Sequence, residues 1–150
     1  MRPFAFPLKR VRDYKEQIFD KEKETLAKYR SRQRELELEL QENRAYLTEK
    51  REKLSNRQRL GIKMAEIHAA QSLIAAAERS IQEMEQRVEE AQAATAAQLK
   101  IVLAQSKEIS SLDKLEEKKR EEYLHEAAKE FENLILENLT TQLAFHPQQQ

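Results

Sequence analysis

The chain has 150 residues and no net charge, and 36% of its residues are Asp, Glu, Lys or Arg. It contains no cysteine, so disulfides and thiolate metal sites are excluded, and its mean hydropathy of −0.87 leaves too little apolar material for a thick globular core. One glycine and three prolines supply few turns, which together with abundant Ala, Glu, Lys and Leu is typical of long helices. Disorder is the competing interpretation, and the periodic apolar residues argue against it.

The chain opens with an aromatic pair set between prolines, in the stretch MRPFAFPLKR. Pro7 suits the first position of a helix, so we expect the first helix to begin there. The apolar patch around Phe4 and Phe6 is too short and too broken by prolines to be the ~7–15-residue core of a signal peptide. No apolar run approaches the ~20 residues of a membrane span. We therefore expect a cytoplasmic protein, which the lack of cysteine also suits.

The first helix is predicted from about residue 7 to about residue 55. Its seam is half polar, so this helix would be weak alone and would gain most of its stability from packing against a partner helix. The residues that recur every seventh position are Leu26, Gln33, Leu40, Leu47 and Leu54.

A turn is predicted over about residues 56–62. Ser55, Asn56 and Gly61 form the only cluster of turn-forming residues in the middle of the chain. The charge changes sign at the same place, because residues 1–60 carry a net charge of +6 and residues 61–150 a net charge of −6. Each exposed ion pair contributes only ~0–1 kcal/mol, so the charges help to choose a folded-back pairing rather than to hold it.

The second helix is predicted from about residue 62 to about residue 140, followed by a frayed tail over 141–150. A heptad seam runs through seven repeats of it, which is the pattern of a coiled coil. The first seam positions, mostly β-branched aliphatic residues, are Ile67, Ile74, Ile81, Val88, Thr95, Val102 and Ile109. The positions three residues further on, several of them alanine, are Ala70, Ala77, Met84, Ala91, Gln98, Gln105 and Leu112.

These patterns predict an all-α fold in which two long helices form an antiparallel coiled-coil hairpin, the second helix longer than the first. We expect one coiled-coil domain over residues 1–150. The alternative is one unbroken helix that forms a parallel dimer, since Gly61 alone would cost a helix only about 1 kcal/mol.

The unequal lengths leave the end of the second helix without a partner. If the chain folds back at the predicted turn, Leu8 reaches only to about Asp113, and residues 114–140 project further by roughly 40 Å. An amphipathic stripe with no partner in the chain needs one elsewhere. Phe4 and Phe6 fall at the same end, where they either cap this overhang or dock into another protein. The apolar residues of the overhang are Tyr123, Leu124, Ala128, Phe131, Ile135 and Leu139.

No pattern in the sequence predicts catalysis, a cofactor or a metal site. Glycine-rich nucleotide-binding motifs and Cys/His clusters are missing, and His68, His125 and His146 lack metal-ligand spacing, so solvated or packing roles are expected for them. A two-helix rod offers no cleft that would shift the pKa values of a catalytic pair. The basic clusters at 9–12 and 30–34 are offset by nearby acids, so we expect no nucleic acid partner. The mixed charge of the overhang favours a protein partner over a membrane.

Three stretches together are less generic than a coiled coil. They are F-x-F-x-L at residues 4–8, a turn near Gly61, and LDKLEEKKREEY at 112–123 followed by KEFENLILENL. On these residues the chain resembles the flagellar export proteins of the FliJ family over essentially its whole length. The resemblance implies a small antiparallel coiled coil of the flagellar type III export apparatus, similar in form to the central stalk subunit of rotary ATPases.

The resemblance also implies partners: the hexameric export ATPase FliI, its regulator FliH and the membrane export gate protein FlhA, with export chaperones left open. The terminal end would sit in the ATPase ring and promote its assembly and ATP hydrolysis, and a patch nearer the turn would meet the gate. The residues implied for the ring are Phe4, Phe6, Leu8, Val11, Tyr123, Leu124, Phe131, Ile135 and Leu139. Those implied for the gate are Asn43, Tyr46, Leu73 and Ala77.

Three other functions stay open at this point. One is a dimeric coiled-coil spacer or adaptor, which sedimentation would separate from a hairpin monomer of 17.7 kDa. The second is a stalk subunit of an archaeal or vacuolar rotary ATPase, which we would expect to be longer. The third is the equivalent stalk protein of a virulence type III secretion system, which the sequence separates poorly from the flagellar one.

Overall fold

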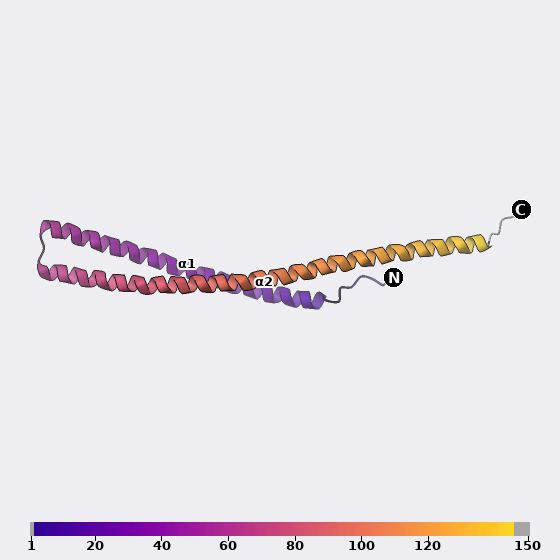
Figure 1. Cartoon of the computed structure of the whole chain (residues 1–150), viewed down its shortest axis with the longest axis horizontal. Helices are drawn as coiled ribbons and strands as arrows, with labels where there is room; N and C mark the ends of the chain where they lie inside the picture. The colour runs from indigo at the N-terminus through magenta and orange to yellow at the C-terminus, as the bar shows by residue number, and fades with distance from the viewer. Residues whose placement is uncertain (1, 146–150) are drawn as a thin grey trace. The chain divides into compact units, whose positions relative to one another are not determined.

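The structure is a computed structural model and describes residues 2–145. Two α-helices make up nearly all of this part of the chain, α1 over Lys9–Leu60 and α2 over Met64–Phe145, and it contains no β-strand. Figure 1 shows the two helices joined by a short turn. The predicted all-α class, with two long helices of which the second is longer, is confirmed. Contacts group the chain into two compact units, residues 20–103 and the residues up to 19 together with those from 104 onward. Whether the chain is one domain, as expected from the sequence, stays a prediction.

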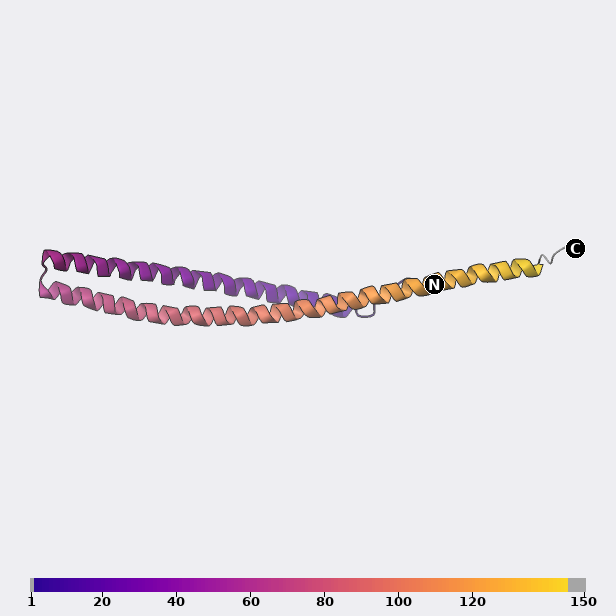
Figure 2. The same ribbon diagram turned by 45° about the horizontal axis from the view of Figure 1, so that its top comes forward.

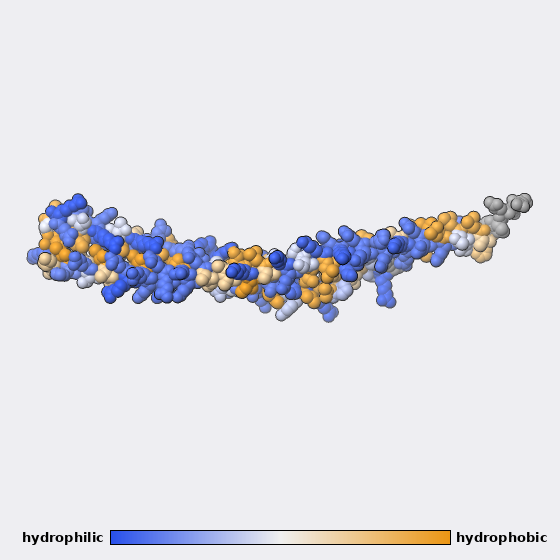
Figure 3. All heavy atoms as spheres, in the orientation of Figure 1, coloured by the Kyte–Doolittle hydropathy of each residue, from blue (hydrophilic) through white to orange (hydrophobic). Residues whose placement is uncertain are grey.

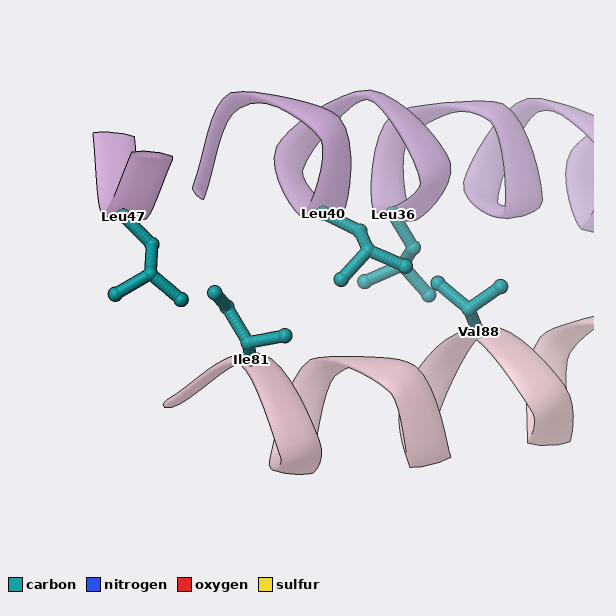
Figure 4. Close-up of a cluster of buried hydrophobic side chains, with 5 residues drawn as sticks. All are labelled: Leu36, Leu40, Leu47, Ile81 and Val88. Atoms are coloured by element: carbon teal, nitrogen blue, oxygen red, sulfur yellow. The ribbon is translucent and has the colours of Figure 1, made fainter. Parts of the chain in front are cut away.

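Residues 20–103 form an antiparallel pair of helices with a buried seam. In both views of the ribbon, α1 and α2 run side by side as they leave the turn (Figures 1 and 2). Leucines of α1 point toward β-branched side chains of α2 and form a buried cluster (Figure 4). The members of this cluster are Leu36, Leu40, Leu47, Ile81 and Val88.

The heptad seam predicted for the second helix is confirmed. All fourteen predicted positions, from Ile67 to Leu112, are buried or half-buried. Gln98 is a buried polar member of this seam, and its side-chain amide donates to the backbone carbonyl of Glu22 at 3.0 Å and to the Glu22 carboxylate. Because the amide finds acceptors on α1, its burial leaves no unpaired donor.

The ion pairs between the helices follow the charge split of the sequence. Each pair seen in the described part of the chain joins a cation of α1 to a carboxylate of α2. In residues 20–103 these are Arg44–Glu85 at 3.0 Å, Arg51–Glu78 at 2.6 Å and Arg57–Glu66 at 4.0 Å. In the other unit they are Arg12 with Asp113 and Glu116, and Lys15 with Glu108.

The turn is shorter than the predicted span of 56–62, since α1 continues to Leu60 and α2 begins at Met64. Ser55 and Asn56 have modest helix propensity, but they do not break a helix that packs against a partner. Gly61 reverses the chain with a φ of 82°, the left-handed conformation that commonly ends a helix. The turn predicted from three residues therefore depends on Gly61 alone.

Both chain ends also differ from the prediction. Pro7 biases Phe6 toward an extended conformation, so α1 begins at Lys9 rather than at Pro7. At the other end α2 continues past residue 140 to Phe145, and the Thr140 hydroxyl donates to the Leu136 carbonyl within the helix at 2.8 Å. Of the tail predicted over 141–150, residues 141–145 are helical, and residues 146–150 lie outside the described residues.

Candidate functional site

An N-terminal strap, defined as residues 2–8, packs against α2 within its unit. The ring centroids of Phe4 and Tyr123 lie 5.6 Å apart, and the Arg120 guanidinium lies 5.3 Å from the Phe4 ring centroid. The Tyr123 hydroxyl donates to the backbone carbonyl of Arg2 at 2.6 Å, and Phe6 is only 9% exposed. The opening aromatic pair therefore contributes to packing within the chain, which is one of the two roles that the sequence left open.

The strap makes the uncovered part of α2 shorter than predicted. Arg12 pairs with Asp113 at 3.4 Å and also with Glu116, so α1 reaches further along α2 than the alignment of Leu8 with Asp113 implied. An extended strap advances about 3.3 Å per residue, against 1.5 Å for a helix, and it reaches Tyr123. The prediction that the uncovered part begins at residue 114 is wrong, because this extended segment was counted as helix.

Beyond the strap, α2 carries an exposed apolar face. Every side chain from Ala128 to Phe145 is exposed. We define the C-terminal stripe as four large side chains that share one face of a 3.6-residue helix. Its members are Leu124, Phe131, Ile135 and Leu139, exposed by 43–64%. Figure 3 shows apolar surface along this end of α2. Over residues 128–145 the prediction of an apolar stripe without a partner in the described chain is confirmed.

The exposed apolar surface is wider than the sequence predicted. Leu134, Leu136, Leu143 and Phe145 are also exposed and flank the C-terminal stripe. The prediction missed them because it followed a single helical face and ended the helix near residue 140. The run of three aliphatic residues at 134–136 was the signal that could have widened it. The opposite face of this segment is polar and carries Lys129, Asn133, Glu137 and Thr140.

The nine residues implied for the ATPase ring therefore fall into two groups. Phe4, Phe6 and Tyr123 are buried or half-buried in the packing of the strap against α2. The remaining six are exposed, although Leu8 at 37% and Val11 at 43% are only partly so. The structure brings Phe4 and Tyr123 together, whereas the stripe residues from 128 onward extend past the strap.

The four residues implied for the export gate also divide between seam and surface. The Asn43 side-chain amide donates to the Met84 sulfur at 3.4 Å, and Ala77 packs against the buried cluster, so both belong to the helix seam. Tyr46 and Leu73 are exposed. The Lys50 ammonium lies 5.3 Å from the Tyr46 ring centroid, a cation–π contact that leaves much of the ring open to a partner.

Leu73 lines the floor of a small groove between α1 and α2, of about 180 Å³. The groove has a basic rim formed by Lys50, Lys53 and Arg57, with Glu66 as its one acidic residue. Its apolar floor includes Leu54, Ile62, Leu73 and Ile74. The surface around Leu73 therefore combines apolar contact area with positive charge.

Two carboxyl groups have shifted pKa values, and both shifts are local. The side-chain amides of Gln33 and Gln92 donate to the Glu37 carboxylate at 2.9 and 3.3 Å and lower its pKa. The Lys53 ammonium bonds the Glu49 carboxylate at 3.1 Å and lowers its pKa. A lowered pKa in the folded state means that each group stabilises the fold at neutral pH and loses this effect as the pH falls through the folded pKa.

The described residues, 2–145, contain no group of side chains that could hold a metal ion. His68 and His125 are exposed, and His146 lies outside the described residues. Neither α1 nor α2 has a stretch long and apolar enough to cross a lipid bilayer.

A family model described as Flagellar FliJ protein matches residues 4–135, most of the 150-residue chain. The chain belongs to the FliJ family. It is a FliJ-type flagellar export protein, in agreement with the resemblance that its sequence motifs carry. The chain has no match among curated proteins and none among solved structures.

The span that matches the FliJ family relates directly to the surfaces described above. It begins at Phe4, in the strap, and runs through both helices to Ile135, so it includes most of the C-terminal stripe. Leu139, Leu143 and Phe145 lie beyond the matched residues. Membership in the FliJ family favours the flagellar export apparatus over the alternatives of a dimeric spacer or a rotary ATPase stalk.

Proposed function

We propose that this FliJ-type protein is a stalk of the flagellar export apparatus that inserts the end bearing its strap and C-terminal stripe into the ring of the export ATPase FliI. The observation that carries the proposal is that every side chain from Ala128 to Phe145 is exposed although this segment holds a stripe of large apolar residues. Full burial of a large apolar side chain contributes about 1.5–3 kcal/mol, so a partner that covers the stripe would gain several such increments.

The protein acts by binding rather than by catalysis, and it needs no cofactor. A single helix with one apolar face cannot make identical contacts with all six subunits of a ring. A ring state that fits this asymmetric contact better than the others becomes more populated when the stalk binds. The stalk thereby promotes ring assembly and ATP hydrolysis, in the cytoplasm at the flagellar base, where the regulator FliH belongs to the same assembly.

Contact with the export gate protein FlhA belongs to a second surface. Tyr46 and Leu73 are the two exposed members of the residues implied for the gate, and Leu73 lines the groove with the basic rim. We assign the contact with the gate to these two side chains. Asn43 and Ala77 instead hold α1 against α2, so their substitution would disturb the helix pair as well as any partner contact.

The ring contact is tested by removing the stripe without disturbing the helix. In the F131A/I135A/L139A variant the exposed apolar side chains are lost, while alanine keeps the helix propensity high. We expect the concentration of the chain that half-stimulates ATP hydrolysis by FliI to rise by about tenfold or more, because the core of the contact is gone. The measurement is the steady-state ATPase rate of FliI against the concentration of added chain.

A matched control removes three side chains from the polar face of the same segment. This variant is N133A/E137A/T140A, and we expect it to stimulate FliI like the unchanged chain. Circular dichroism must show equal helix content for both variants. Undiminished stimulation by the stripe variant would sink the proposal.

A further inference from the structure

The turn between α1 and α2 displays apolar side chains that nothing in the chain covers. Leu60 is 88% exposed, more than any other large hydrophobic residue of the described chain, and Met64 is 67% exposed. They stand on either side of Gly61, where the chain reverses. We call residues 57–64 the turn tip. Figure 3 shows apolar surface at this end of residues 20–103.

The turn tip is also positively charged. Arg57, Arg59 and Lys63 lie within residues 56–65, which contain no acidic residue. Arg57 lies 4.0 Å from the Glu66 carboxylate, at the outer limit of an ion pair. Arg59 and Lys63 form no ion pair in the described part of the chain. Cations and exposed apolar side chains are therefore combined in eight residues.

The stability of the hairpin explains only part of this arrangement. Arg57 and Arg59 stand in the last turn of α1, where positive charge interacts favourably with the helix dipole. Lys63 immediately precedes α2, where the same dipole disfavours a cation. Leu60 and Met64 bury little of their surface against the fold. The fold by itself thus accounts for two arginines, and not for Lys63, Leu60 or Met64.

The turn tip does not line a concave site. The groove nearest to it is lined by residues 50–57, 62, 66 and 70–74, and neither Leu60 nor Met64 contributes to it. Side chains that stand out from a turn suit insertion into a soft surface better than the reception of a protein segment. Exposed apolar side chains flanked by basic ones are the pattern of segments that lie in the headgroup region of an anionic bilayer.

We propose that the turn tip binds the surface of an anionic lipid membrane, with Arg57, Arg59 and Lys63 on lipid headgroups and Leu60 and Met64 inserted between them. Each cation near an anionic membrane strengthens binding by about fivefold. A single short anchor gives only marginal membrane binding, so this contact acts on a protein that its other partners already hold near the membrane. The proposal is independent of the contact with the export ATPase.

Flotation of the full chain with lipid vesicles tests the charges. We expect binding to vesicles of equal parts phosphatidylcholine and phosphatidylglycerol, no binding to pure phosphatidylcholine, and loss of binding at high salt. The R57Q/R59Q/K63Q variant should bind roughly a hundredfold more weakly. The control variant K28Q/R30Q/R34Q removes three exposed cations away from the turn, and it should keep its binding.

A fluorescent reporter tests the position of the contact. The chain contains no tryptophan, so a single one can be placed at will. We expect the emission of the L60W variant to shift to shorter wavelength on anionic vesicles. Leu38, 57% exposed on α1, supplies the matched control, and the emission of L38W should stay unchanged. This measurement does not depend on the behaviour of the charge variants.

Three results would overturn the proposal. The first is an equal loss of binding for the two glutamine variants, and the second is an unshifted L60W emission at millimolar anionic lipid. The third is binding of the turn tip to soluble polyglutamate, but not to vesicles, which would assign it to an acidic protein surface instead. None of these results bears on the stimulation of FliI by the C-terminal stripe.

Discussion

At the scale of single residues, Gly61 decides where the chain reverses. Its φ of 82° lies in the left-handed region, which side chains with a Cβ rarely adopt. A Cβ built at this position meets no atom within 4 Å, so space does not select for glycine. The requirement is one of backbone conformation alone.

Replacing Gly61 by alanine therefore isolates that conformational cost. We expect G61A to lower the free energy of unfolding by about 1 kcal/mol. G61N should cost less, because asparagine tolerates the left-handed conformation at the end of a helix. Urea unfolding followed by circular dichroism checks both variants. Equal stability of G61A and the unchanged chain would show that the turn does not need this conformation.

At the scale of the elements, burial in the seam separates two leucines that are neighbours on α1. Leu40 is 7% exposed and belongs to the buried cluster with Ile81 and Val88, whereas Leu38 is 57% exposed. We expect L40A to lower the free energy of unfolding by about 2–3 kcal/mol, and L38A to change it by less than about 0.5 kcal/mol. The same urea unfolding experiment measures both variants. Similar losses for the two would contradict the observed seam.

The elements also show what the sequence alone can predict. The heptad positions of α2 were all predictable, because a seven-residue apolar repeat has one helical interpretation. The ends of the helices were not, since Ser55 and Asn56 are weak signals that packing overrides. The strap was misread because proline and phenylalanine alone do not reveal how far an extended segment reaches along a neighbouring helix.

At the scale of the whole molecule, two facts bear on function. The cations of α1 face carboxylates of α2, so the opposite charges of the two halves are used within the chain. The large apolar side chains beyond Ala128 are not used within the described chain. The sequence predicted the central line of this stripe, but not its width, since a helical wheel shows one face and the observed surface spans several.

The candidate site was predictable to a similar degree. The Phe4 and Tyr123 pair was expected at one end of the molecule, yet its packing inside the chain depends on the course of the strap, which no residue pattern encodes. Of the residues implied for the gate, Tyr46 and Leu73 are on the surface, whereas Asn43 and Ala77 stabilise the helix pair. Family resemblance alone does not separate these two roles.

The central claim is that the C-terminal stripe meets the export ATPase, and site-specific photocrosslinking tests it most directly. A photoreactive phenylalanine derivative is placed either at Ile135, on the stripe, or at Asn133, on the polar face two residues away. Each full chain is then irradiated with hexameric FliI. The account predicts a strong crosslink to FliI from position 135 and a weaker one from position 133. No crosslink from position 135 at saturating FliI would contradict it.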